Sequence, residues 1–390
     1  MSWGFDLPGD RRARNATKWR VAEKATNDDG EPVIPMWIAD MDFRAPPAVL
    51  DALQAAIAHG IPGYQEWSED FPALFCRWQA RRHRWTLSPE WLLPCQSVVG
   101  ALDVIVDSLS QPGDEIIVFS PGFAAFSRVI QQTQRRVVTV PLRVNGLEYA
   151  LDPDRLTAAI TPRTRMLILC NPHNPLGKAW CQNELQQIID ICLRHNLLLV
   201  SDDVHQDLHL SQSHYTPVAS LNAAIAASAV TFTSPCKTFN FSGLPVTNMV
   251  IENARIRECI RSRLVQRSLH KPNALAMVAC EAAYRHGGPW LDALCQYLHG
   301  NYVQLQKALH QHTSIRLFHS QGGYLGWLDF NRCGLSHAAL EQRLVQKAGL
   351  LLESGTHFGP EGEGFMRLNF ALPRRQLAQA ITRLQREFPG

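Results

Sequence analysis

Apolar, β-rich runs alternate with amphipathic stretches through the middle of this chain, and the alternation constrains the fold more than any other feature. Such an order is typical of strands that are joined in parallel by helical crossovers. It predicts an α/β fold with a mostly parallel central sheet flanked by helices. The candidate strands are residues 115–119, 136–142, 166–170, 197–200, 230–233 and 249–251, and the candidate helices are residues 97–109, 182–195 and 272–286.

The pattern changes at Pro289, where a long helix begins that repeats apolar residues at spacings of three and four. Two strand-like runs and two more helical runs follow it. Because 390 residues suffice for two domains, we predict a large domain over 46–288 and a smaller α+β domain over 289–390. The N-terminal segment, 1–45, is expected to associate with the small domain. The later runs are 323–328, 338–348, 365–370 and 374–387.

Charge and composition narrow the classes of partner. The 38 Lys and Arg residues are interspersed with 35 acidic residues, so we expect no basic surface for nucleic acid. The N-terminal stretch has no apolar run typical of a signal peptide, and no later stretch reaches the ~18 apolar residues that a membrane helix needs. The sequence therefore favours a cytoplasmic protein that binds a small molecule.

The cysteines and histidines do not indicate a metal site. Ten cysteines are scattered without a C-x-x-C pair, so most are expected to be reduced and buried. His205 and His209 have the spacing of the zinc ligands on a metalloprotease helix. Gln206, however, stands where that mechanism needs a glutamate base. We predict no metal.

Two polar segments follow predicted strands and should meet at the carboxyl edge of the sheet, where open α/β sheets bind ligands. The first is 170–177, rich in Asn, Pro and Gly, which is also an ordinary composition for a structural turn. The second is 201–205, which delivers the carboxylates of Asp202 and Asp203 to the same edge. One of these carboxylates needs a partner, and a helix cap or a salt bridge is as good an explanation as function for this segment alone.

A third segment, 233–240, follows the next strand and places Lys237 after hydroxyl and thiol residues at the mouth of an apolar region. A lysine at such a place can simply be solvated. If it is desolvated instead, its pKa falls, and the amine then reacts with a carbonyl carbon to form an imine.

In this order, the three segments resemble the fold-type I enzymes that depend on pyridoxal 5'-phosphate (PLP), in the aminotransferase class I/II superfamily. The superfamily's pattern is N-P-x-N-P-x-G, then S-D-E, then S-x-S-K. The resemblance implies that Lys237 holds PLP covalently and that Asp202 keeps the pyridine nitrogen protonated. It further implies that Asn174 bonds the phenolic oxygen and that Phe123 stacks on the ring.

The resemblance also implies how the phosphate and the substrate are held. Backbone amides of Ser97, Val98 and Val99 lie at the start of a predicted helix, where an anion is favoured, and Ser234 adds its hydroxyl. Tyr64 matches a tyrosine that reaches the phosphate of the neighbouring subunit, which implies a homodimer with shared active sites.

For the substrate, Arg367 resembles the arginine that binds the α-carboxylate of an amino acid as a bidentate fork, although a surface arginine in a late strand is the plain alternative. Asp40 and Tyr64 are the other residues expected to contact the substrate. Trp37, Trp67 and Tyr324 are plausible liners of the pocket for the substrate side chain, and each is also a candidate for core or interface packing.

Within the superfamily, the chain resembles the MalY/PatB branch of cystathionine β-lyases and cysteine carbon-sulfur lyases. The segment 35–43, PMWIADMDF, looks like the signature of that branch. His205 stands where aminotransferases carry a tyrosine, and Pro245 stands where many carry a phosphate-binding arginine. The resemblance implies a PLP-dependent carbon-sulfur β-lyase that cleaves L-cystathionine or related S-substituted cysteines to a thiol, pyruvate and ammonia.

Three residues depart from the sequence pattern of the family, and two other functions are compatible with the sequence. Asp203 replaces the usual Glu, Cys236 replaces a serine before the lysine, and Phe123 replaces the tyrosine of the lyase branch, so that a hydroxyl is missing there. The alternatives are a class I/II aminotransferase, which shares the early steps, and a PLP-binding regulatory protein with little turnover.

Overall fold

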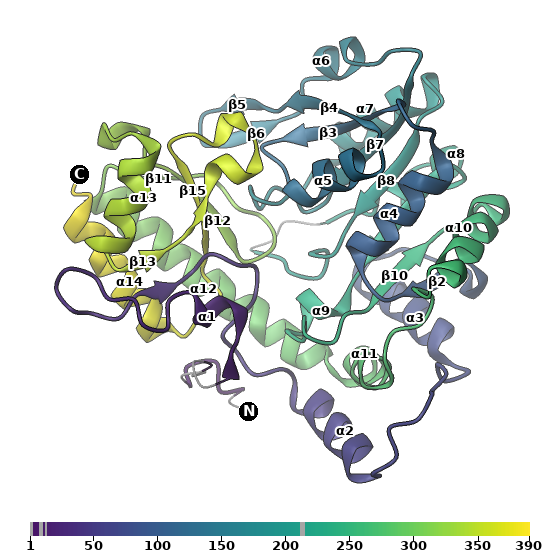
Figure 1. The fold of residues 1–390 in the computed structure, drawn as a ribbon, viewed down its shortest axis with the longest axis horizontal. Helices are drawn as coiled ribbons and strands as arrows, with labels where there is room; N and C mark the ends of the chain where they lie inside the picture. Colours follow the sequence, from purple (N-terminus) through teal and green to yellow (C-terminus); the bar gives the residue numbers. More distant parts are fainter. Residues whose placement is uncertain (1–2, 8–10, 12–13, 211–214) are drawn as a thin grey trace.

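A seven-stranded sheet forms the centre of the molecule in a computed structural model that describes residues 3–7, 11, 14–210 and 215–390 (Figure 1). Its strand order is β2-β10-β9-β8-β7-β3-β4. The pairs β3·β4, β3·β7, β7·β8 and β8·β9 are parallel. The strands are β2 (Leu92–Cys95), β3 (Glu115–Ser120), β4 (Arg136–Pro141), β7 (Thr164–Cys170), β8 (Leu198–Asp202), β9 (Ala229–Thr233) and β10 (Thr247–Val250).

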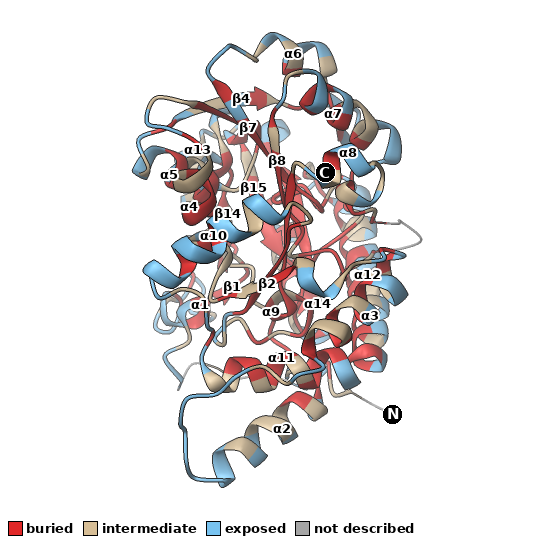
Figure 2. Cartoon of the chain, turned by 90° about the vertical axis from the view of Figure 1, so that its right-hand side faces the viewer, coloured by how far each residue is buried: buried red, intermediate tan, exposed pale blue. Residues whose placement is uncertain are grey.

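Helices cover both faces of this sheet, so its central strands are buried on two sides. Successive residues of β3 illustrate this, because Ile116 and Val118 enter one apolar core while Ile117 and Phe119 enter the other. Figure 2 shows the sheet as a buried centre inside a more exposed shell. The connecting helices include α4 (Val98–Leu109), α5 (Ala124–Gln132), α7 (Gln182–Arg194), α10 (Ala254–Gln266) and α11 (Ala274–His286).

The predicted α/β class and the six predicted strands are confirmed, with one difference in direction. β10 runs antiparallel to β9 and to β2. The segment between β9 and β10 holds only α9 (Pro235–Thr238), a single helical turn. A parallel return needs a crossover, usually a longer helix, and without one the chain turns back beside β9.

The C-terminal part begins with α12 (Gly288–His312) and contains a four-stranded sheet in the order β11-β12-β15-β14. The strand β1 (Ile34–Pro35) pairs in parallel with β13 (Leu350–Leu351), so the N-terminal segment lies against this part of the chain. The division into domains at 45 and 288 stays a prediction. The remaining elements of this part are β11 (Arg316–Leu317), β12 (Leu325–Asp329), η4 (Asn331–Cys333), α13 (His337–Gln346), β14 (Glu353–Ser354), η5 (Gly355–Phe358), η6 (Pro360–Gly362), β15 (Phe365–Asn369) and α14 (Arg374–Glu387).

The N-terminal segment is fastened by a buried ion pair. The Nζ atom of Lys18 lies 2.7 Å from Asp42 and 3.0 Å from the carbonyl oxygen of Asp40. The indole nitrogen of Trp19 donates to the other oxygen of Asp42. Breaking one partner of such a pair is costly because a charge is left buried and alone, so this pair fixes the segment that carries residues 36–43.

The backbone answers two questions raised by the sequence: whether His205 and His209 lie on one helix, and whether any helix could span a membrane. Residues 203–209, which hold His205 and His209, form turns and a bridge rather than a helix, so the metalloprotease spacing is not presented on one helical face. In the part of the chain that the structure describes, no helix combines the length and the apolar character needed to span a bilayer.

Candidate active site

A cavity of about 480 Å³ lies at the carboxyl edge of the central sheet. This volume is in the range of small-molecule sites. The structure brings ten of the twelve predicted site residues together around it. They are Ser97, Val98, Val99, Phe123, Asn174, Asp202, His205, Ser234, Lys237 and Arg367.

Strand topology explains why residues distant in sequence meet here. Asn174 follows β7, Asp202 ends β8, and Lys237 lies in α9 directly after β9. These three strands are neighbours that run in the same direction, so their carboxyl ends share one edge of the sheet. Arg367 comes from β15 of the C-terminal sheet and also lines the cavity.

Lys237 is half-buried and lines the cavity. Its Nζ atom donates a hydrogen bond of 2.6 Å to the carbonyl oxygen of Ala39. Desolvation lowers the pKa of Lys237 below its usual 10.5, while the charge of Asp40 acts in the opposite direction. The site therefore favours an uncharged amine at a lower pH than a surface lysine would allow, which is the form that attacks a carbonyl carbon.

The carboxylate of Asp202 lacks an adequate partner. Burial raises its pKa to about 7, and the Val204 amide at 3.4 Å and the charge of Lys237 offset this only in part. Asp203 points elsewhere and accepts hydrogen bonds from Ser201 and Tyr215. Of the two carboxylates, Asp202 is thus the one that faces the cavity and would be stabilised by a cationic group placed there.

Arg367 is buried and is held in one orientation. Its guanidinium donates to Asn174 Oδ1 at 2.9 Å and to the carbonyl oxygen of Trp37 at 2.7 Å, and it lies 4.8 Å from the ring centre of Phe358. Its Nε atom has no hydrogen-bond partner among the described residues. Burial lowers the pKa of Arg367 to about 10. A fixed and incompletely bonded guanidinium is suited to a carboxylate ligand.

His205 is kept neutral by its surroundings. Burial first, and then the positive charges of Lys237 and Arg367, lower its pKa to about 3. Its ring lies edge-on to Tyr324 at 5.6 Å. Its Nδ1 atom finds no hydrogen-bond partner in the described part of the chain. A neutral imidazole in the cavity wall offers a hydrogen bond without adding charge.

One end of the cavity is formed by a helix start. Ser97 is the N-cap of α4 and accepts a hydrogen bond from the Gly100 amide, so Val98 and Val99 form the first turn. Such a turn presents backbone N–H groups and the positive end of the helix dipole to an anion. Ser234 lies nearby in the lining, with its hydroxyl donating to the carbonyl oxygen of Val246 at 2.6 Å.

Two predicted site residues lie outside the cavity. Tyr64 is fully exposed on the connection after α2 (Pro47–Ala58), in a stretch, 59–66, that is exposed throughout (Figure 2). Asp40 pairs with Arg11 at 2.6 Å and acts on Lys237 through its charge rather than by contact with the cavity. Neither residue is brought to the site by this single chain.

The candidate liners for a substrate side chain also lie elsewhere. Trp37 lines a different cavity, Trp67 stacks on Phe71 at 3.9 Å, and Tyr324 is buried with its hydroxyl donating to the carbonyl oxygen of Ala39.

The role of Ala39 was not predicted from the sequence. Its carbonyl oxygen accepts hydrogen bonds from both the Tyr324 hydroxyl and the Lys237 amine. No sequence signal reports a main-chain acceptor, because every residue carries one.

Residues 31–384 match the aminotransferase class I and II family. The chain belongs to this family. It is 36% identical to cystathionine beta-lyase PatB of Bacillus subtilis, over 98% of both chains, and 31% identical to protein MalY of Escherichia coli, over 97% of both. Among solved structures, cystalysin of Treponema denticola matches with a TM-score of 0.95 and 29% identity over 99% of both chains.

Within this aminotransferase class I and II family member, the three unusual residues have distinct surroundings. Asp203 is buried behind the cavity, where desolvation raises its pKa to about 8. Cys236 is a buried thiol that packs beside Lys237 and lines the cavity. Phe123 also lines the cavity, at the N-cap of α5, and presents a ring with no hydroxyl. Phe123 and Cys236 are thus the two departures that change the polar groups available in the cavity, each by the loss of a hydroxyl.

Proposed function

We propose that this protein is a PLP-dependent carbon-sulfur β-lyase that cleaves L-cystathionine or related S-substituted cysteines to a thiol, pyruvate and ammonia. The observation that carries the proposal is the single cavity that holds a desolvated lysine amine, an unpaired buried carboxylate and an oriented arginine. A second support is the 36% sequence identity, over nearly the whole chain, to a protein named cystathionine beta-lyase.

The residues of the cavity fit pyridoxal 5'-phosphate. The Asp202 carboxylate, poorly compensated as it stands, would pair with the pyridinium nitrogen. The first turn of α4 would receive the phosphate, with Ser234 beside it. Asn174 would bond the phenolic oxygen, the Phe123 ring would lie against the cofactor ring, and Lys237 would carry the cofactor covalently. When bound, PLP supplies an electron sink for the negative charge that develops when the α-proton of an amino acid is removed.

The protein's own residues account for binding and proton transfer. Arg367 would bind the α-carboxylate of the substrate and thereby fix the direction of its α-hydrogen. The Lys237 amine would act as the base inside the cavity, and its lowered pKa suits it to remove that proton. The neutral His205 would act as a hydrogen-bonding group in the wall.

We also propose a cytoplasmic homodimer with shared active sites. Tyr64 is exposed in the single chain, and it would gain a binding role if it reached the phosphate of a second subunit. All ten cysteines are unpaired, as in proteins of reducing compartments.

The test is the product formed by the purified holoenzyme from a panel of cysteine thioethers, L-cystathionine among them, with and without an added keto acid. We expect pyruvate without the keto acid, and none above background from the Lys237→Ala variant. Turnover that requires a keto acid would identify an aminotransferase instead. PLP bound without turnover of any thioether would favour a regulatory protein.

A further inference from the structure

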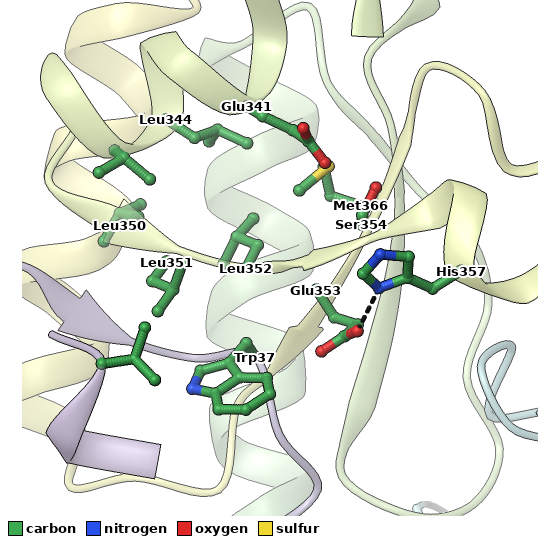
Figure 3. A pocket seen from close by; sticks show the side chains of 12 residues that line it. Trp37, Glu341, Leu344, Leu350, Leu351, Leu352, Glu353, Ser354, His357 and Met366 are labelled. Atoms are coloured by element: carbon green, nitrogen blue, oxygen red, sulfur yellow. Dashed lines mark hydrogen bonds and ion pairs between the residues drawn. The ribbon is translucent and has the colours of Figure 1, made fainter. Parts of the chain in front are cut away.

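A second cavity, of about 350 Å³, is lined in part by Glu353, whose carboxylate lies 4.0 Å from the Arg367 guanidinium, and it shares no lining residue with the catalytic cavity. It is enclosed by α13, by the strands β13, β14 and β15, and by the N-terminal segment (Figure 3). Its twelve lining residues are Val21, Trp37, Glu341, Leu344, Val345, Leu350, Leu351, Leu352, Glu353, Ser354, His357 and Met366.

We propose that this cavity is a regulatory site for a small organic cation, an ammonium group on an apolar body, and that its occupancy strengthens substrate binding at Arg367. The first part of this proposal is independent of the reaction catalysed. The second part, the coupling, rests on the proposed lyase function.

The charge of the cavity selects a cation. Its described lining contains two glutamates, Glu341 and Glu353, and no lysine or arginine. Each glutamate has a neighbour outside the apolar wall: the exposed His357 bonds Glu353 Oε1 at 2.7 Å, Arg367 lies 4.0 Å from Glu353 Oε2, and His337 lies 3.4 Å from Glu341. The carboxylates of Glu341 and Glu353 would repel an anion in the cavity, so ligands with a carboxylate, including free amino acids, are disfavoured.

The walls of the cavity select an apolar body. Leu344, Leu350, Leu351 and Leu352 form the apolar part of the wall, and Figure 3 shows the two glutamates at separate places, Glu341 on α13 and Glu353 beside His357. The ring of Trp37 completes the wall, held in place because its Nε1 atom donates to the carbonyl oxygen of Lys18 at 3.1 Å. An ammonium group is attracted both to a carboxylate and to the face of an indole ring.

Glu353 connects this cavity to the catalytic one. It is the direct cross-strand neighbour of Arg367 in the antiparallel pair β14·β15. Glu353 Oε2 lies 4.0 Å from the guanidinium, beyond hydrogen-bond distance, so Glu353 acts on Arg367 through its charge. Its negative charge also repels a substrate carboxylate approaching Arg367. A cation bound beside Glu353 removes that repulsion, so the substrate binds more tightly.

Binding is tested by calorimetry of the holoenzyme with butyltrimethylammonium, which has no N–H group and so does not form an imine with an aldehyde. We expect saturable binding, with hexanoate and hexanol at least about tenfold weaker. Glu341→Gln should weaken binding about tenfold without changing turnover. Val345→Lys, at a half-buried position, should abolish binding by placing a competing cation in the cavity.

The proposed site is overturned if butyltrimethylammonium does not bind, or if both variants bind it as the native protein does. If a second copy of the chain covers the cavity, the result is also no binding, and the proposal fails.

Coupling is tested by kinetics with L-cystathionine. Saturating butyltrimethylammonium should lower KM about fivefold with kcat unchanged, and Glu353→Gln should lower KM by itself and remove the response. An unchanged KM, or a response that persists in Glu353→Gln, overturns the coupling. If the protein proves not to be a lyase, the calorimetric result still decides the site, so the two failures are distinguishable.

Discussion

The Nζ atom of Lys237 donates a 2.6 Å hydrogen bond to the carbonyl oxygen of Ala39, although the two residues are far apart in sequence. Ala39 belongs to the N-terminal segment, which is fastened in turn by Asn240 and Asn369. Asn240 bonds the carbonyl oxygens of Met41 and Phe43, and Asn369 bonds those of Ile38 and Asp40. The N-terminal segment is therefore part of the catalytic architecture, and the amine is positioned by main-chain geometry.

The first prediction concerns the reactivity of this amine. Because desolvation lowers the pKa of Lys237, the uncharged amine is present below the usual lysine range. We expect the rate of PLP incorporation into cofactor-free protein to rise with pH and to level off at a midpoint below 10.5. Stopped-flow absorbance between about pH 6 and 11.5 measures this rate. A midpoint at 10.5 or above would show that the amine is solvated.

The second prediction concerns Asp202. Its pKa in the folded, cofactor-free protein is about 7, above the 3.8 of an unfolded chain. Folded protein therefore binds more protons than unfolded protein between these values, so the stability falls as pH rises through this window and stays low above it. Asp202→Asn removes the effect. We expect the cofactor-free variant to be more stable than the native chain by about 4 kcal/mol at pH 8, with little difference below pH 4.

Urea denaturation at both pH values measures that difference, with the exposed Asp190→Asn as the control. The same Asp202→Asn variant should lose most of its turnover, since the group that pairs with the pyridinium is gone. Equal stabilities at pH 8 would mean that Asp202 is adequately compensated without the cofactor.

The third prediction concerns Arg367. Lysine keeps the positive charge but not the planar fork that bonds Asn174 and the Trp37 carbonyl oxygen. We expect Arg367→Lys to raise KM for an amino-acid substrate about 10- to 100-fold, with a smaller effect on kcat. Arg163→Lys is the matched control, because Arg163 is a largely exposed arginine paired with Glu115. Equal KM values for both variants would remove Arg367 from the substrate site.

The fourth prediction concerns the missing hydroxyl at Phe123. Phe123→Tyr keeps the ring face, so cofactor affinity should change by less than about twofold. The new hydroxyl adds a proton donor and acceptor to the cavity, and we expect faster pyruvate formation from L-cystathionine. Phe123→Leu, which removes the ring, should bind PLP several-fold more weakly. Tyrosine without any effect on turnover would show that the hydroxyl has no part in proton transfer here.

Much of this architecture was predictable because it depends on local patterns. The helix at 374–387 has the predicted bounds, and the strand predicted at 115–119 extends one residue further, to Ser120. The alternation of apolar runs also predicted that Asn174, Asp202 and Lys237 would share one edge of the sheet, since parallel neighbours end together. The period of the apolar residues predicts the elements, and the order of the strands predicts which residues lie at the same edge of the sheet.

The features that the sequence did not predict depend on how strands distant in sequence pair with each other. The apposition of Glu353 and Arg367 is set by the pairing of β14, only two residues long, with β15. A run of two residues has no periodicity to read. The direction of β10 was not predicted for a related reason, because an apolar strand looks the same in either direction. Only the short connection through α9 distinguishes the two.

The last prediction tests the shared active site. If Tyr64 serves the neighbouring subunit, both Tyr64→Ala and Lys237→Ala homodimers are impaired, each for a different reason. A hybrid of the two holds one site that combines an intact Lys237 from one chain with an intact Tyr64 from the other. Random mixing should therefore restore about a quarter of the native activity, since half the dimers are hybrids with one working site. The measurement is pyruvate formation after the two variants are co-expressed or refolded together. Mixing Lys237→Ala with itself is the control, and a mixture no more active than the mean of its parents would place Tyr64 outside a shared site.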